Sequence, residues 1–200
     1  MKTRTMDKDI NYTVFCYIGN NIFSIPVNLF NRPSIILLDS ENEHQTKILH
    51  HNYQTINLKN VEEIRHVMDS ETISHVVILS EYYVFDDWCQ EYIISLFNKL
   101  LTVLKGITPH LTISRKGKVW IMSPLCTNCE TLTPVNKTII HSLSSGFKMI
   151  TDIYATELAK KNINANFIKR NTISFYEGLE KVLTWAETSP FSLTTQELKL

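Results

Sequence analysis

Two cysteines in this chain have a spacing that is typical of metal or redox chemistry. Cys126 and Cys129 form a C-x-x-C motif, which occurs both as half of a zinc site and as a redox-active pair. A tetrahedral zinc site needs two further ligands, and the sequence offers no second C-x-x-C but only separate histidines such as His110 and His141. Ordinary loop cysteines are therefore the simpler interpretation, and we expect no metal site.

Two polar stretches contain groups that can bind a cation. His50 and His51 lie in a segment that also contains His44 and two glutamates. Asp86 and Asp87 precede a helical pattern, where acidic residues commonly cap the first turn. A solvated loop and a helix cap explain these residues more simply than metal sites do.

The composition places the chain among globular proteins and excludes several functions. Apolar residues make up 44% of the 200 residues, which suits a single domain over residues 1–200. Twenty basic residues balance twenty acidic ones, so there is no basic excess with which to bind nucleic acid. We expect no membrane span, because no apolar run approaches ~20 residues. There is also no apolar signal core before Tyr12 and no secreted-type cysteine pattern, so we expect a cytoplasmic protein.

Short apolar runs rich in β-branched residues alternate with helical patterns along the chain. The expected strands lie at residues 12–18, 34–38, 53–58, 75–80, 119–122, 165–168 and 196–200. The expected helices lie at residues 61–68 and 88–105, around residues 147–160, and at residues 176–187, and Gly106 is expected to end the second of them. Buried strands that alternate with helices predict a parallel α/β sheet with helices on both faces.

Three segments carry a recognisable pattern in a fixed order. Residues 157–166 read ELAKKNINAN, residues 97–122 read FNKLLTVLKGITPHLTISRKGKVWIM, and residues 178–200 read GLEKVLTWAETSPFSLTTQELKL. The first resembles the E-L-A-x-x-G-I-x-V-N step of the short-chain dehydrogenase/reductase (SDR) family, with Asn162 in place of glycine. The other two resemble that family's dimer helix with the following strand, and its C-terminal segment. The resemblance implies a Rossmann-like, doubly wound parallel sheet in three α/β/α layers.

The chain departs from the SDR pattern where that family binds its cofactor. The resemblance implies a glycine-rich turn that brings backbone amides close to a pyrophosphate. Here Gly19 occupies the first glycine position, but Phe23 and Ile25 occupy the next two. Asp39 stands where family members often hold the residue that reads the adenosine ribose, although a strand-end aspartate that caps a turn is the simpler interpretation. We therefore expect no bound NAD(P).

The catalytic positions depart from the pattern as well. The resemblance places the catalytic serine at Ser123 or Pro124, and the Tyr/Lys pair at Ile140 and Ser144. The substrate lid that the family inserts after its sixth strand is also nearly absent. His141 lies beside the lost tyrosine position and could donate a proton, although a histidine on a helix face is the simpler interpretation.

Apolar helices with lost chemistry indicate a non-catalytic partner subunit. The resemblance implies pairing through residues 88–105 and 138–161, either with a second copy or with an active SDR subunit, in a fatty-acid or polyketide type of pathway. The expected interface residues are Tyr92, Leu96, Phe97, Leu100, Leu101, Phe147, Ile150 and Tyr154. Tyr82, Tyr83 and Phe85 could line a pocket or belong to an interface. The alternatives are a divergent NAD(P)-dependent ketoreductase that uses His141 or Ser123, and a small-ligand sensor.

Overall fold

A parallel sheet forms the centre of the molecule. The computed structural model describes residues 11–19, 34–39, 53–69, 72–82, 90–114, 117–126, 133–169, 180, 184 and 197–199, and the structural statements below concern these residues. The strands are β1 (Asn11–Gly19), β2 (Ser34–Asp39), β3 (Tyr53–Ile56), β4 (Thr72–Tyr82), β5 (Lys118–Met122), β6 (Leu125–Cys126), β7 (Asn164–Lys169) and β8 (Glu197–Lys199). Every strand pairing among them is parallel.

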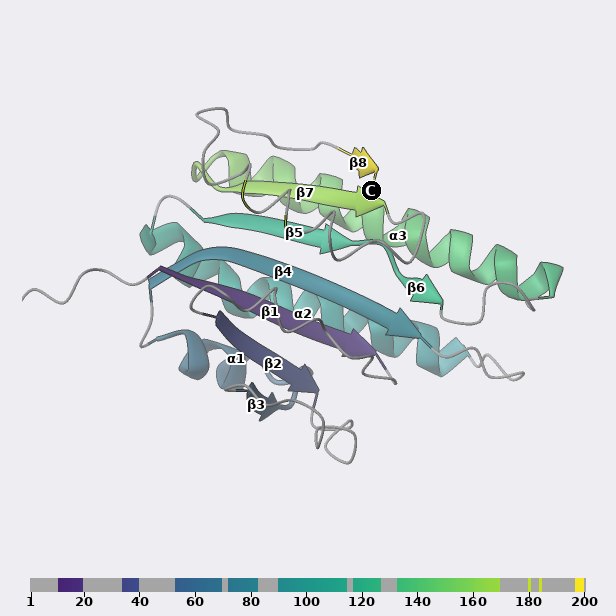
Figure 1. Cartoon of the computed structure of the whole chain (residues 1–200), viewed down its shortest axis with the longest axis horizontal. Helices are drawn as coiled ribbons and strands as arrows, with labels where there is room; N and C mark the ends of the chain where they lie inside the picture. Colours follow the sequence, from purple (N-terminus) through teal and green to yellow (C-terminus); the bar gives the residue numbers. More distant parts are fainter. Residues whose placement is uncertain are drawn as a thin grey trace, which may run out of the picture.

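The strand order makes the sheet doubly wound. The strands lie in the order β3-β2-β1-β4-β5-β7-β8, with β6 paired to β4 (Figure 1). Strands β2 and β3 are therefore added on one side of β1. The chain then crosses back, and β4, β5, β7 and β8 are added on the other side of β1. The reversal lies between β1 and β4, which is where ligands bind in sheets of this kind. The expected Rossmann-like α/β fold is confirmed.

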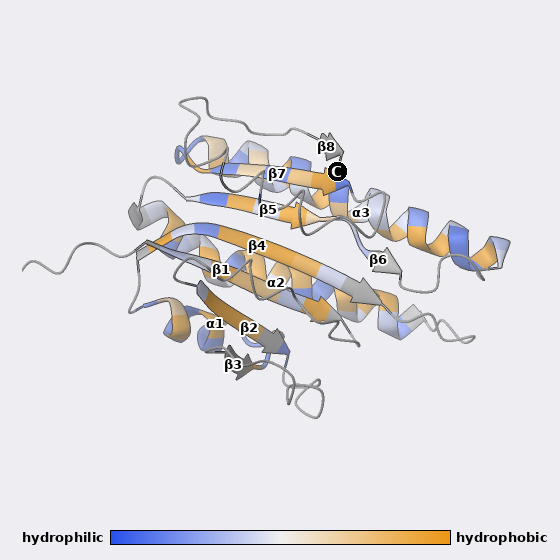
Figure 2. Cartoon of the chain, in the orientation of Figure 1, coloured by the Kyte–Doolittle hydropathy of each residue, from blue (hydrophilic) through white to orange (hydrophobic). Residues whose placement is uncertain are grey.

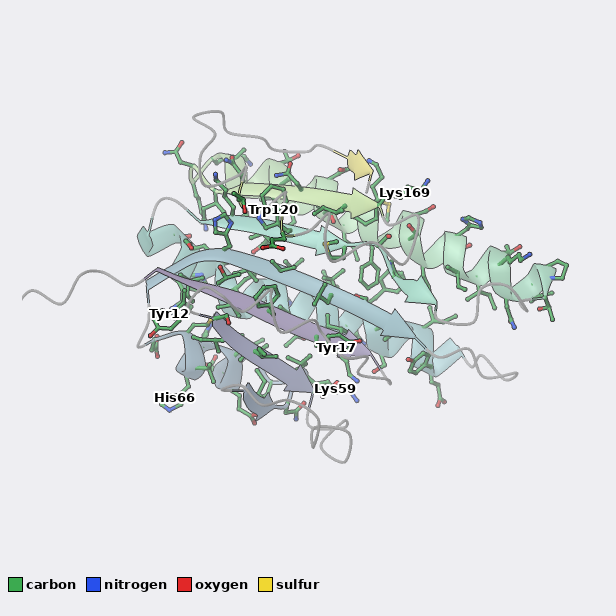
Figure 3. The ribbon with its side chains drawn as sticks, in the orientation of Figure 1. Tyr12, Tyr17, Lys59, His66, Trp120 and Lys169 are labelled. Atoms are coloured by element: carbon green, nitrogen blue, oxygen red, sulfur yellow. The ribbon has the colours of Figure 1, made fainter. Side chains whose placement is uncertain are left out.

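The central strands form because both of their faces are buried. On β1, the residues from Val14 to Ile18 are all 0% exposed, and the apolar runs of β4 and β5 are equally covered. Figure 2 shows hydrophobic residues along these strands. Near-continuous apolar runs are what a parallel sheet covered on both sides requires. Tyr17 and Trp120 project from β1 and β5, whereas His66 points away from the molecule at α1 (Figure 3).

The three helices whose bounds the structure describes are α1 (Val61–Met68), α2 (Gln90–Ser114) and α3 (Pro134–Ala159). They lie on the same side of the sheet in Figure 1, as right-handed crossovers from β3, β4 and β5 require. Their inward side chains share one hydrophobic core with every second residue of the strands, such as Val14, Cys16 and Val76. No helix in the described part of the chain is long and apolar enough to cross a membrane.

The first of these helices begins and ends where the sequence predicts. The side chain of Asn60 accepts a hydrogen bond from the backbone N–H of Glu62 (3.1 Å), which caps the helix at its N-terminus. The Asn60 amide in turn donates to Glu63, and the Glu63 carboxylate also accepts from the backbone of Asn57 (2.8 Å). These local bonds explain why the predicted bounds, residues 61–68, are confirmed.

The second helix is longer than the sequence predicts. We expected Gly106 to end it, but α2 continues through Gly106 and Pro109 to Ser114. The glycine has a packing role instead: a Cβ at this position would lie 2.6 Å from Cγ2 of Ile64 on α1. Close approach of two helices, rather than helix termination, explains this glycine.

The third helix starts with a clear signal and ends at an unusual residue. The Thr133 side chain accepts from the backbone N–H of Asn136 (3.2 Å), and Pro134 occupies the first turn. After the helix, Asn162 adopts a positive φ of 57°. Asparagine is one of the few residues that tolerate this left-handed conformation, which explains how it stands where the SDR pattern has glycine.

The strands predicted at residues 12–18, 34–38, 75–80, 119–122 and 165–168 are confirmed with slightly longer bounds. The strand predicted at residues 53–58 ends earlier, at Ile56, and of the strand predicted at residues 196–200 the structure describes Glu197–Lys199. The two-residue strand β6 was not predicted. Of the helix predicted at residues 176–187, the structure describes Glu180 and Thr184, both helical.

The packing of α1 on α2 gives a first prediction. Replacing Gly106 with Ala should lower the free energy of unfolding, because overpacking costs about 1–3 kcal/mol and the better helix propensity of Ala returns at most about 1 kcal/mol. Urea unfolding of the variant measures the loss. Lys105→Ala, an exposed change one residue away, is the control and should stay within about 0.5 kcal/mol. Equal stability of the two variants would contradict the packing argument.

His110 gives a second prediction, on pH dependence. Burial lowers the pKa of His110 below its ordinary 6.5; Asp69, whose Oδ1 lies 3.7 Å from Nδ1, opposes this, and Arg65 adds to it. The imidazole of His110 therefore binds a proton more tightly in the unfolded chain than in the folded one. The free energy of unfolding is fully present above pH 6.5, and it decreases as the pH falls through the unfolded pKa toward the lower folded pKa. His110→Gln should flatten this decline in urea midpoints measured between about pH 7.5 and 5. An unchanged slope would show that His110 does not contribute.

Candidate functional site

The candidate site lies at the carboxyl edge of the sheet, between the ends of β1 and β4. Gly19 is the last residue of β1 and pairs with Glu81 of β4. The positions of Phe23 and Ile25 lie outside the described residues. Ser80, also near this edge, is 0% exposed. The strand ends that would face a nucleotide in a Rossmann-like sheet are thus in place.

Asp39 lies at this edge but turns its side chain into the protein. It is the last residue of β2 and stands two positions after Leu37, so both project from the same face, the one covered by α1 and α2. Its Oδ2 lies 2.6 Å from Nζ of Lys99 on α2, and the two side chains are only 1% and 6% exposed. The carboxylate belongs to a buried ion pair, which neither the ribose interpretation nor the turn-capping interpretation of Asp39 predicts; the turn after β2 lies outside the described residues.

This ion pair is also unsuited to reading a ribose. Both charges are withdrawn from water, which costs several kcal/mol per ion unless each finds a partner. Oδ1 of Asp39 has no hydrogen-bond donor in the described part of the structure, while Oδ2 faces the Lys99 ammonium. A carboxylate that is 1% exposed and neutralised by a lysine is not presented to a ligand at the edge of the sheet.

The position of the catalytic serine falls in a β-bulge. Between the pairs Ile78↔Ile121 and Glu81↔Leu125, β4 has two residues and the facing strand has three, so one residue is extra. Pro124 is suited to this place because it has no N–H to donate to the ladder. The backbone N–H of Ser123 donates to the carbonyl of Ile168 (2.8 Å), and its side chain is 3% exposed. Neither Ser123 nor Pro124 presents a free group to a substrate.

On α3, the positions of the Tyr/Lys pair carry no titratable group. Ile140 and Ser144 are four residues apart on one side of the helix, and both are half-buried. His141 is exposed and lies about 100° around the helix from Ile140. Its carbonyl accepts a hydrogen bond from the Ser145 hydroxyl (2.9 Å). The histidine therefore does not take over the place of the expected tyrosine.

The one tyrosine on α3, Tyr154, has a structural role. Its hydroxyl donates to the carbonyl of Leu104 (3.0 Å) and contacts the Thr108 hydroxyl, so it joins α3 to α2. Burial raises the pKa of Tyr154 to about 12, which the hydrogen bond to Thr108 only partly opposes. A phenol that is this hard to ionise and already bonded to a neighbouring helix is poorly placed to donate a proton to a substrate.

The other candidate groups give no site among the described residues. Cys126 belongs to β6, whereas Cys129 lies outside the described part, as do His50, His51, Asp86, Asp87, Tyr83 and Phe85. No group of three or more His, Cys, Asp or Glu side chains in the described part is arranged to hold a metal ion.

The outer surface of α2 and α3 is unusually apolar. All the large hydrophobic side chains that are exposed in the described residues lie on these two helices: Ile94, Leu101, Val135, Met149 and Ile153, at 40–66% exposure. Between the helices lies a cavity of about 170 Å³. Its lining residues are Ile93, Phe97, Thr138, Ile139, Ser142 and Leu143. Single exposed apolar residues are common on protein surfaces, but these five are confined to one pair of helices.

This surface corrects part of the predicted interface. Leu96, Leu100 and Phe147 are at most 1% exposed, because they face the sheet and form its core, so they are not surface residues. Leu101 is 40% exposed, and Tyr92, Phe97, Ile150 and Tyr154 are half-buried. Met149 and Ile153, which the prediction does not include, are exposed on the helix face opposite the core.

The comparisons with known proteins come from structure alone. No protein-family model matches the sequence, and no curated protein does either. An oxidoreductase of the short-chain dehydrogenase/reductase family from Brucella ovis, in complex with a partially ordered NAD, matches with a TM-score of 0.68 at 11% identity, over 95% of this chain and 99% of that one. Serine dehydrogenase from Escherichia coli matches at 0.64 and 10% identity, over 94% and 96%. A putative 3-oxoacyl-reductase from Bacillus thuringiensis matches at 0.64 and 10%, over 96% of each chain. The fold of this chain is SDR-like.

The buried ion pair gives a third prediction. Replacing Lys99 with Met leaves the Asp39 carboxylate buried without a counter-charge, and this should cost about 3–5 kcal/mol of stability. The double variant Asp39→Leu/Lys99→Met should cost much less than the two single changes together. Urea unfolding of the four proteins measures the coupling.

The exposed pair Lys160–Glu157 (2.9 Å) supplies the control. Lys160→Met should cost no more than about 1 kcal/mol, because water screens the pair. Equal losses from Lys99→Met and Lys160→Met would show that burial does not strengthen the Asp39–Lys99 interaction.

Proposed function

We propose that this chain is a non-catalytic, SDR-like protein that acts as a structural or regulatory partner subunit. The observation that carries the proposal is the contrast on α3. This helix bears exposed apolar residues at Val135, Met149 and Ile153, but Ile140 and Ser144 at the positions of the catalytic pair. The helix is thus equipped to bind another surface and not to move a proton.

The chemistry of carbonyl reduction supports this reading. A proton donor such as a phenol must lie within hydrogen-bond reach of the substrate oxygen, and a nearby ammonium lowers its pKa. Ile140 has no proton to give, and Ser144 has no charge with which to tune a neighbour. Tyr154 is bonded to Leu104 and Thr108 instead. Lys99, the buried lysine among the described residues, is neutralised by Asp39.

The same reasoning applies to the cofactor. In Rossmann-like proteins an acidic residue near the end of the second strand can bind the adenosine ribose. The carboxylate of Asp39 faces Lys99 and the helix layer, away from that place. Together with Phe23 and Ile25 in the glycine positions of the sequence, this supports a chain that does not use NAD(P).

The partner in this proposal is another SDR-like subunit, which is either a second copy of this chain or an active reductase. A reductase of 3-oxoacyl compounds would place the assembly in fatty-acid or polyketide-type synthesis, and the putative 3-oxoacyl-reductase from Bacillus thuringiensis shares the fold. The opposing candidate is a divergent NAD(P)-dependent ketoreductase. It draws on the likeness to the Brucella ovis oxidoreductase, which is in complex with a partially ordered NAD.

Titration with NADH and NADPH separates these two functions. We expect no rise in thermal midpoint up to about 1 mM of either nucleotide, whereas a ligand at 100 times its Kd stabilises by about 2.7 kcal/mol. An intact SDR reductase measured alongside is the positive control. A saturable shift that is abolished by Gly19→Trp, a change at the end of β1, would overturn the non-catalytic assignment and favour the reductase.

A further inference from the structure

We propose that the cavity between α2 and α3 binds a small, uncharged aromatic molecule that carries one hydroxyl group and has the size of phenol. The cavity lies within a single chain, and the inference goes beyond the proposed partner role without depending on it. Its evidence is the volume of the cavity, the chemistry of the side chains that line it, and a hydroxyl at its mouth that the protein does not use.

The cavity lies beside the place where α2 and α3 meet. The hydroxyl of Tyr154 joins the helices further along by donating to the carbonyl of Leu104 (3.0 Å). Nearer their N-termini, Phe97 lies against Gly146, where Cζ of the ring would be 2.6 Å from an added Cβ. The preceding turn of α3 carries only the short side chain of Ser142, and the cavity of about 170 Å³ is found there.

The walls of the cavity are apolar. Ile93 and Phe97, one turn apart, come from α2, and Ile139 and Leu143, also one turn apart, come from α3. Leu143 is 2% exposed and closes the floor, whereas the other three side chains are half-buried. An apolar cavity of roughly 150 Å³ in another protein binds benzene. The volume of about 170 Å³ therefore has room for one six-membered ring with a small substituent.

The lining selects an uncharged and aromatic ligand. None of the described side chains that line the cavity carries a charge, so a carboxylate or an ammonium group would lose its water on entry and find no counter-charge. The Phe97 ring favours an aromatic ligand, because aromatic rings pair in offset or edge-to-face geometry. Phe97 already packs in a tilted orientation against Phe147, with ring centroids 5.6 Å apart, and a bound ring would extend this cluster.

A hydroxyl at the mouth supplies the polar contact. Thr138 and Ser142 both line the cavity and are exposed. The Thr138 hydroxyl donates to the carbonyl of Pro134 (3.0 Å), one turn earlier, and Thr151 and Thr156 bond to α3 in the same way. The Ser142 hydroxyl makes no hydrogen bond in the described part of the chain. It is therefore available to a ligand hydroxyl while the ring occupies the cavity.

Titration of the isotope-labelled full chain with phenol, followed by backbone amide NMR, tests the site. We expect saturable shifts around Phe97 on α2 and Ser142 on α3, with a Kd of about 0.1–1 mM for so small a ligand. Benzoate has the same ring but is charged at neutral pH. It should bind at least about 10-fold more weakly, because the lining offers no counter-charge.

Three variants make the result specific. Ser142→Phe should abolish phenol binding, because a benzyl side chain at the mouth fills the cavity. His141→Phe, at an exposed position about 100° around α3, is the matched control and should leave the Kd unchanged. Ser142→Ala should weaken phenol binding about 2- to 10-fold by removing one hydrogen bond. Toluene, which has no hydroxyl, should bind to Ser142→Ala as it does to the unmodified chain.

The exposure of residues 141 and 142 means that both phenylalanine variants should fold, and thermal unfolding checks this. The inference would be overturned by phenol shifts that do not saturate by about 10 mM, by benzoate binding as tightly as phenol, or by an unchanged phenol Kd in folded Ser142→Phe. Equal weakening of phenol and toluene by Ser142→Ala would refute the hydrogen bond. Binding of NADPH would refute the non-catalytic assignment and leave this site intact.

Discussion

The central strands are buried on both faces, and this constraint decides what every polar group on the sheet can do. A buried polar group must find its partner inside the protein. Asp39 therefore pairs with Lys99 at 2.6 Å, and Trp120 donates from Nε1 to Nδ1 of the buried His75 at 3.2 Å. Each of these groups would be a candidate for ligand binding if it were judged by residue type alone. Their partners show that the fold uses them to satisfy its own interior.

The parts of the fold that could be predicted from sequence are those with local causes. The strands follow from short apolar runs, and α1 follows from the cap that Asn60 provides. The end of α2 could not be predicted, because Gly106 is set by Ile64 of a different helix. A glycine after an apolar stripe has the same appearance in sequence whether it ends a helix or lets a neighbour approach. Only the three-dimensional arrangement separates the two.

The candidate site shows the same limit more strongly. The identity of the residues at the catalytic positions was readable, because it depends only on alignment to a pattern. The environment of Asp39 could not be predicted from the sequence, because its partner Lys99 is 60 residues away along the chain. The interface prediction failed at Leu96, Leu100 and Phe147 for a related reason. A helix with apolar residues on more than half of its circumference has two apolar faces, and the sequence does not say which of them meets the sheet.

The backbone requirements of an SDR-like helix and its chemical requirements are separable, and this chain satisfies the first set. Asn162 holds the left-handed turn after α3 without glycine, and Gly146 admits the ring of Phe97, which packs against Phe147 in a tilted orientation with ring centroids 5.6 Å apart. Tyr154 joins α3 to α2 through a hydroxyl that remains protonated. None of these contacts needs a reactive group at residues 140 or 144. A helix fixed in this way holds its outer face rigid, and a rigid apolar face loses little conformational entropy on association. The features that keep α3 in place are therefore also the ones that the proposed partner role would use.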